Sequence, residues 1–359
     1  MIPAARPDIG EDEVNAALDV IRSGMLAQGA EVEAFEREFA LEAVDERLCV
    51  AVNSGTSAQH LAMVALGIGP GDEVIVPSFT FAATANCVAF TGATPVFVDI
   101  EPDHFTIDPA AVEAAITPRT RGVVPVHLYG HPANLSALTE VCERNGLWLV
   151  EDAAQAHLAS WAGHLVGTVG VAATFSFYPT KNMTSGEGGM IVTSDPGIAR
   201  IVRLLRNQGQ EKRYENEIVG LNNRMTDVHA AIGRVQLAAL KARTQKRREN
   251  AKFYDEHLRG VVTPTVHAHA THVYHQYTIR LVDQDRGRFV EQLASLGVAT
   301  GIYYPTPVHR LASYKRADAL HHTDIASREV LSLPVYPSLS EAERDRVAAA
   351  VNHLSGAGA

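Results

Sequence analysis

Between residues 45 and 205 the sequence alternates short, apolar, β-branched runs with alanine-rich stretches that have helical spacing. In such a pattern the strands pair in parallel, and helices cover both faces of the resulting sheet. The predicted strands are 49–52, 73–76, 95–98, 122–127, 147–150 and 171–177, and the predicted helices are 56–66, 82–90, a stretch beginning at 109, and 134–144. The alternation predicts an α/β fold with a mainly parallel central sheet in a large domain.

The pattern changes after residue 226, where one long helical stretch reaches about residue 258. The elements predicted beyond it are a strand at 277–282, a helix at 287–296 and a terminal helix from about residue 340. A chain of 359 residues is long enough for two domains of unequal size. We therefore predict a large domain over 1–240 and a smaller α+β domain over 241–359, with a frayed tail, SGAGA.

Charge and cysteine content disfavour several classes of protein. The formal net charge of -10 disfavours a nucleic-acid or membrane-surface partner. No run approaches the ~20 apolar residues that a membrane-spanning helix needs. The long helical stretch carries five basic residues that we interpret as a solvated face rather than a nucleic-acid patch: Lys241, Arg243, Lys246, Arg247 and Arg248. The three cysteines form no CxxC pair and the first residues do not resemble a signal peptide, which predicts a soluble, cytoplasmic protein.

Residues 53–58, NSGTSA, lie where a predicted strand turns into a helix. The glycine permits a tight turn, and the hydroxyl residues Thr56 and Ser57 lie beside the free N–H groups of the helix N-terminus. Those donors and the helix dipole favour an anion, which makes the segment a candidate phosphate site. The same residues are also consistent with a simple helix cap that binds no ligand.

Two further segments place reactive side chains just after predicted strands. Asp152 follows the strand 147–150, at the carboxyl end where open α/β sheets bind their ligands, and an aspartate there can pair with a cationic ring nitrogen. Lys181 follows the strand 171–177, and a lysine near a phosphate site and an acid is placed to form an imine. Considered singly, Asp152 is also consistent with a helix cap, and a loop lysine is usually only solvated.

Taken together, these segments resemble a known family. The matching motifs, which stand in the family's order, are NSGTSA, PSFTFAATANCV, PVHLYGHPA, VEDAAQAH, SFYPTKN with GEGG, RNQGQ, and GLNNRMTD with VQL. The chain is similar over nearly its whole length to the DegT/DnrJ/EryC1/StrS family of sugar aminotransferases. The resemblance implies the fold type I aminotransferase architecture and pyridoxal 5′-phosphate as cofactor.

The resemblance also implies roles for single residues. Lys181 would form the Schiff base, and Asp152 would pair with the pyridine nitrogen. The other implied cofactor contacts are Thr56, Ser57 and Ser176 at the phosphate, Phe81 stacked on the ring, Gln155 on its phenolic side, and Asn222 from the second subunit of a homodimer with shared active sites. The implied substrate contacts are Tyr304 and His309, from the segment YPTPVH, and Glu187.

The implied reaction is transamination of a nucleotide-linked keto-sugar, with the ketone at C3 or C4 and glutamate or glutamine as amino donor. A keto-cyclitol is the alternative acceptor. Three other activities compete with transamination. Sugar dehydratases of the family carry a histidine in place of the Schiff-base lysine, so Lys181 disfavours that reaction. A lyase of the same fold could share the cofactor contacts, but the GLNNRMTD and YPTPVH segments favour transamination of sugars. A non-catalytic cofactor-binding regulator is disfavoured by the intact set of Asp152, Lys181 and Thr56.

Four histidines, at 267, 269, 272 and 275, raise the possibility of a metal site. Their spacing fits neither one helix face nor a standard zinc pattern. Residues 273–281 also resemble a core strand of the family. No metal site is predicted.

Overall fold

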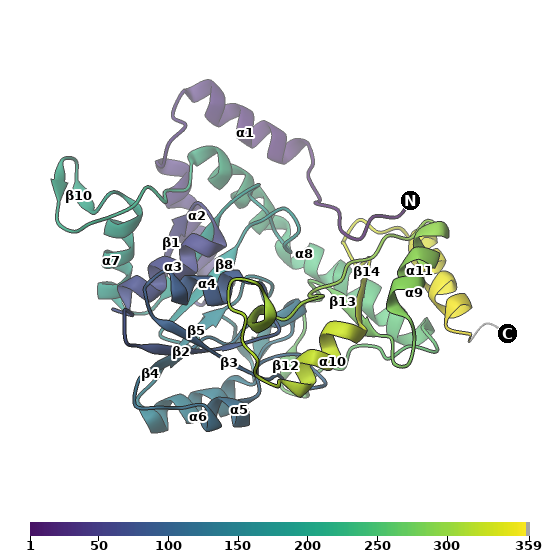
Figure 1. Ribbon diagram of the computed structural model, residues 1–359. Coiled ribbons are helices and arrows are strands. Elements are labelled where there is room, and N and C mark those ends of the chain that lie inside the picture. Colours follow the sequence, from purple (N-terminus) through teal and green to yellow (C-terminus); the bar gives the residue numbers. More distant parts are fainter. Residues whose placement is uncertain (357–359) are drawn as a thin grey trace.

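A seven-stranded sheet forms the centre of the protein in the computed structural model, which describes residues 1–356 (Figure 1). Its strands, in spatial order, are β1 (Leu48–Val52), β9 (Gly189–Thr193), β8 (Ala172–Ser176), β5 (Trp148–Asp152), β4 (Thr120–Val123), β2 (Glu73–Pro77) and β3 (Thr94–Val98). β9 runs antiparallel to both of its neighbours, and the remaining pairs are parallel. The predicted α/β fold with a mainly parallel sheet is confirmed.

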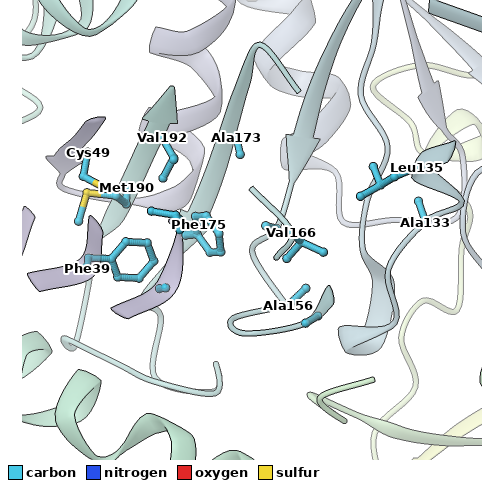
Figure 2. Close-up of a cluster of buried hydrophobic side chains, with 14 of the residues drawn as sticks. Phe39, Cys49, Ala133, Leu135, Ala156, Val166, Ala173, Phe175, Met190 and Val192 are labelled. Carbon is cyan, nitrogen blue, oxygen red and sulfur yellow. The ribbon is translucent and has the colours of Figure 1, made fainter. Parts of the chain in front are cut away.

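Helices cover both faces of this sheet (Figure 1). One face packs against α2 (Ala30–Ala43), α5 (Pro109–Ala114), α6 (Leu135–Asn145) and the first half of α8 (Asp227–His257), and the other against α3 (Gly55–Ala65), α4 (Ala83–Ala89) and α7 (Pro196–Arg206). Side chains that alternate along each strand supply the two cores. In β1, Cys49 joins the core that contains Phe39 of α2, whereas Val50 joins the core that contains Leu61 of α3. Figure 2 shows Phe39 beside Phe175, with ring centroids 5.1 Å apart.

Apart from the two cores on the sheet, which are taken together as the first core, a second hydrophobic core lies at the far end of α8. The elements around it are β13 (Tyr277–Arg280), its antiparallel partner β14 (Val330–Leu333), α9 (Arg286–Ser295) and α11 (Glu341–Leu354). Leu240 of α8 packs in the first core and Ala251 in the second, so the proposed boundary at residue 240 falls inside one continuous helix. Ile2 also packs in the second core. The division into 1–240 and 241–359 stays a prediction.

Several elements were not predicted from the sequence. They are α1 (Glu11–Ser23), α2, α7, β9, α10 (His321–Glu329), β14, the hairpin β10 (Gln210–Lys212) and β11 (Glu215–Asn216), and the short strands β6 (Ser160–Trp161), β7 (His164–Leu165) and β12 (Ala270–Thr271). β9 is antiparallel because no helix separates it from β8 along the chain. The expected fraying of the tail falls partly on residues 357–359, which lie outside the described residues.

Candidate active site

The carboxyl ends of the parallel strands open into a cavity of about 550 Å³. Its walls come from the N-terminus of α3, the start of α4, the ends of β5 and β8, and two segments near residues 275 and 303. The side chains that line it and carry the argument below are Thr56, Asp152, Ser176, Lys181, Glu187 and Tyr304. Together with Phe81 and Gln155, eight of the residues predicted from separate parts of the sequence thus share one space, where α/β sheets bind their ligands.

Asp152 is the last residue of β5 and is buried. Its Oδ2 accepts a hydrogen bond from the hydroxyl of Thr84 at 2.9 Å, and its Oδ1 accepts one from the backbone N–H of Ala154 at 3.1 Å. Both donors are neutral groups, so these two contacts bring no positive charge to the carboxylate. A buried carboxylate of this kind favours a protonated ring nitrogen as its partner.

Lys181 lies four residues beyond Phe177 and lines the same cavity as Asp152. Burial lowers the pKa of its amine from 10.5 to about 8, although the negative charge of Asp152 acts in the opposite direction. About a tenth of the amine is therefore uncharged at pH 7, far more than for an ordinary lysine. Only an uncharged amine can attack a carbonyl carbon or accept a proton, so this lysine is chemically prepared for both steps.

The N-terminus of α3 forms another wall of the cavity. Ser54 is the N-cap residue, and its hydroxyl accepts a hydrogen bond from the backbone N–H of Ser57 at 3.1 Å. Gly55 lies so close to Ser176 that a β-carbon on it would approach the Ser176 β-carbon to 2.7 Å. The exposed Thr56 and the hydroxyl of Ser176 face the cavity beside this helix end. Helix N–H groups with adjacent hydroxyls form an anion site.

The opposite wall contains aromatic and amide side chains. The ring of Phe81, which is 60% exposed, lies 6.0 Å from that of Tyr304. The amide nitrogen of Gln155 donates to the hydroxyl of Tyr304 at 3.2 Å, and its carbonyl oxygen accepts from the backbone N–H of Tyr129 at 2.8 Å. Glu187 is exposed at the margin of the cavity. This wall therefore presents two aromatic rings, one amide and one carboxylate to the cavity.

Three of the predicted site residues do not line the cavity. Ser57 is turned toward the capping Ser54, with their hydroxyl oxygens 3.0 Å apart. His309 is fully buried elsewhere, where its Nδ1 lies 2.5 Å from the hydroxyl of Ser78. Asn222 is exposed and pairs with Asn207 through backbone groups. Direct substrate contact by His309 has no support in this arrangement.

Other cavity residues were not singled out from the sequence. Thr84 and Gln276 line the cavity, as does His275, which the sequence placed only in a group of histidines of mixed spacing. The Nδ1 of His275 lies 3.3 Å from the Oδ1 of Asn182, the neighbour of Lys181. A helix such as 82–90 carries no local signal that one threonine faces Asp152, so Thr84 could not have been found without the tertiary structure.

The residues of this cavity fit pyridoxal phosphate. Lys181 supplies an amine with a lowered pKa, and buried Asp152 supplies a partner for a protonated pyridine nitrogen. The N-terminus of α3 with Thr56 and Ser176 provides donors for the phosphate. These three groups come from separate elements and face one cavity, which is the arrangement that the cofactor requires.

The DegT/DnrJ/EryC1/StrS aminotransferase family model matches residues 7–352. The chain belongs to this family. The dTDP-3-amino-3,4,6-trideoxy-alpha-D-glucose transaminase of Streptomyces venezuelae is 42% identical over 358 residues, which cover 98% of this chain and 94% of that protein.

Solved structures of the family have the same fold. DesV of S. venezuelae, solved in complex with a ketimine intermediate, has a TM-score of 0.92 at 42% identity and covers 96% of this chain and 94% of its own. NtdA of Bacillus subtilis, solved with bound cofactor PMP, has a TM-score of 0.89 at 32% identity, with 96% of this chain and 82% of that chain covered.

Membership confirms the expected fold, enzyme class and cofactor. The protein is a pyridoxal-phosphate-dependent aminotransferase of fold type I, and its relatives include sugar aminotransferases that act on nucleotide-linked sugars. Within residues 1–356, no helix is long and apolar enough to cross a membrane. The described part of the chain also holds no cluster of three or more His, Cys, Asp or Glu side chains suited to a metal ion.

Proposed function

We propose that this aminotransferase transfers an amino group from glutamate to a nucleotide-linked keto-sugar, with the ketone at C3 or C4. The observation that supports it most directly is the shared cavity of Lys181, Asp152 and the N-terminus of α3. Relatives whose names specify nucleotide sugars support the choice of acceptor. A keto-cyclitol is the alternative acceptor.

Lys181 and Asp152 divide the chemistry between them. Bound pyridoxal phosphate supplies an electron sink for the negative charge that develops on the α-carbon of the amino donor. Asp152 would hold a proton on the ring nitrogen, which keeps that sink effective. Lys181, once its amine is free, would carry the proton from the α-carbon of the donor to C4′ of the cofactor. A pKa of about 8 suits both directions of that transfer near neutral pH.

The remaining cavity residues bind and orient. Thr56 and Ser176 hold the phosphate with the N–H groups of α3, and Ser57 acts through the cap that it forms with Ser54. The other proposed contacts are Phe81 against the ring, Gln155 on its phenolic side, and Tyr304 and Glu187 at the substrate. His309 is not retained, because it is buried outside the cavity.

We propose a homodimer in which Asn222 of the partner subunit reaches the phosphate. Asn222 does not line the cavity of its own chain, and it follows the hairpin of β10 and β11 closely in sequence. Tyr214 of this hairpin is 81% exposed, and Val219 just beyond it is 94% exposed. Subunit interfaces commonly bury aromatic and apolar side chains of this kind.

The test of the assignment begins with the lysine. Borohydride reduction of the holoenzyme, followed by peptide mapping, should show the cofactor covalently attached to Lys181. The variant Lys181→Ala should bind the cofactor, but borohydride should not attach it to the protein. Glutamate should remove the visible absorbance of the wild-type holoenzyme. Nucleotide-linked 3-keto and 4-keto sugars, but not keto-cyclitols, should restore it. Cofactor trapped on another lysine would refute the site, and restoration only by a keto-cyclitol would refute the acceptor.

A further inference from the structure

Tyr129 is connected to three separate walls of the cavity. Its backbone N–H donates to the carbonyl oxygen of the Gln155 side chain at 2.8 Å. Its backbone carbonyl accepts from the N–H of Gln276 at 3.1 Å, and its hydroxyl donates to the backbone carbonyl of Tyr303. Gln155, Gln276 and Tyr303 all line the cavity, whereas Tyr129 lies behind them and is 3% exposed.

The backbone of Tyr129 makes these three contacts possible. Its φ of 59° lies in the left-handed region, which non-glycine residues seldom adopt. Gly130 follows with a φ of 94°, and a β-carbon there would come within 2.9 Å of the backbone nitrogen of His275. The turn thereby brings its carbonyl groups against the segment 273–276, where Val273 donates to Gly130 at 3.1 Å. Strain of this kind persists where the surroundings hold it, often at functional sites.

Two of the three contacts, those to Gln155 and Tyr303, converge on Tyr304. Gln155, oriented by the backbone of Tyr129, donates its amide hydrogen to the Tyr304 hydroxyl at 3.2 Å. The Tyr129 hydroxyl holds the residue immediately before Tyr304. Because the Tyr304 oxygen accepts from Gln155, its own hydrogen is free to donate to a molecule in the cavity. Burial raises the pKa of the Tyr129 hydroxyl well above its ordinary value, so that group remains a donor.

We propose that Tyr129 is a positioning residue for transamination: it holds the segment 301–304 against Gln155 and so fixes the direction in which Tyr304 donates into the cavity. Tyr129 touches neither cofactor nor substrate in this role. It acts through the carbonyl of Tyr303 and the side chain of Gln155. The inference rests on the proposed substrate contact of Tyr304. The effect of the Tyr129 hydroxyl on the segment 301–304 can nevertheless be measured without any substrate.

The test compares two buried tyrosine hydroxyls in the holoenzyme. Tyr129→Phe removes the bond to Tyr303, and Tyr254→Phe removes a matched bond to the carbonyl of Pro334, 2.9 Å long and outside the cavity. Amide hydrogen exchange in peptides covering residues 301–307 should become about 10-fold faster in Tyr129→Phe and stay unchanged in Tyr254→Phe. Unchanged exchange in Tyr129→Phe overturns the proposal. If that variant is not recovered folded, Gln155→Met breaks the other connection and serves the same comparison.

Kinetics with glutamate supply a second readout. In Tyr129→Phe the apparent dissociation constant for glutamate should rise about 10-fold, while the rate at saturation changes less than 3-fold, because the hydroxyl orients a binding group rather than the reacting atoms. A loss confined to thermal stability, equal in both phenylalanine variants, would mean a purely structural role and overturns the proposal. If the wild-type enzyme does not react with glutamate, the proposed amino donor is refuted. The comparison of amide hydrogen exchange in Tyr129→Phe and Tyr254→Phe then still decides the role of Tyr129.

Discussion

The hydroxyl of Thr84 donates to Oδ2 of the buried Asp152 at 2.9 Å, and so ties the start of α4 to the end of β5. Thr80 lies 3.2 Å from the Thr84 oxygen and continues the hydrogen-bonded chain. The carboxylate that is proposed to hold the pyridinium is therefore fixed by a side chain 68 positions away along the sequence. This contact orients the carboxylate oxygen without neutralising its charge.

Thr84→Val should lower the rate of the glutamate half-reaction about 10-fold. The substitution removes a hydrogen bond to a charged group and leaves the carboxylate less well oriented. Stopped-flow absorbance of the holoenzyme measures this rate. Thr91→Val is the matched control, because Thr91 ends the same helical region and donates only to the carbonyl of Val88, at 2.7 Å. Equal rates in the two variants would show that Thr84 does not support Asp152.

Asp152→Asn should retain cofactor but slow proton transfer by about 10² to 10⁴, because an amide cannot hold the ring nitrogen protonated. Affinity for glutamate should change less than this rate. Asp108→Asn is the control: Asp108 caps α5 by accepting from Ala110 at 2.9 Å, and asparagine caps a helix equally well. If Asp152→Asn had as little effect as Asp108→Asn, Asp152 would serve only to hold Thr84 and the turn at Ala154.

The stability of the apoprotein should depend on pH through Lys181. Its pKa falls from 10.5 in the unfolded chain to about 8 in the fold, so between these values the unfolded state binds more protons. The free energy of unfolding contributed by this group therefore rises from about pH 8 to 10.5, by at most about 3 kcal/mol. Urea titrations at pH 7.5 and 10 should show this increment in the wild type relative to Lys181→Met. Identical pH profiles would contradict the buried amine.

Mixing two inactive variants tests the shared active site. Lys181→Ala and Asn222→Ala subunits, after exchange, should form mixed dimers in which one site is intact and the other carries both substitutions. Activity should therefore reappear on mixing. The control mixes Asn223→Ala with Lys181→Ala, and this mixture should gain no activity. The backbone carbonyl of Asn223 accepts from Asn53 of the same chain at 3.0 Å, and the substitution keeps this bond. No recovery with Asn222→Ala would exclude a contact across the subunits.

The sequence alone was sufficient for the fold class and for the two residues proposed to carry the chemistry. Alternation of strands and helices forces parallel pairing, and parallel strands end at the same edge of a sheet, so Asp152 and Lys181 were expected to meet there. The strand β9 was not predicted, and its short sequence GMIVT does not show that it runs antiparallel to its neighbours.

The tertiary structure alone decided which side chains support that pair. Thr84 meets Asp152, and Tyr129 meets Gln155 and Tyr303, through contacts that no spacing along the chain encodes. His309 follows the segment of Tyr304 closely in sequence, yet it points into the interior while Tyr304 lines the cavity. Local sequence determines where a strand or helix ends. The direction of a side chain in the loop beyond it depends on packing between elements that lie far apart in the chain.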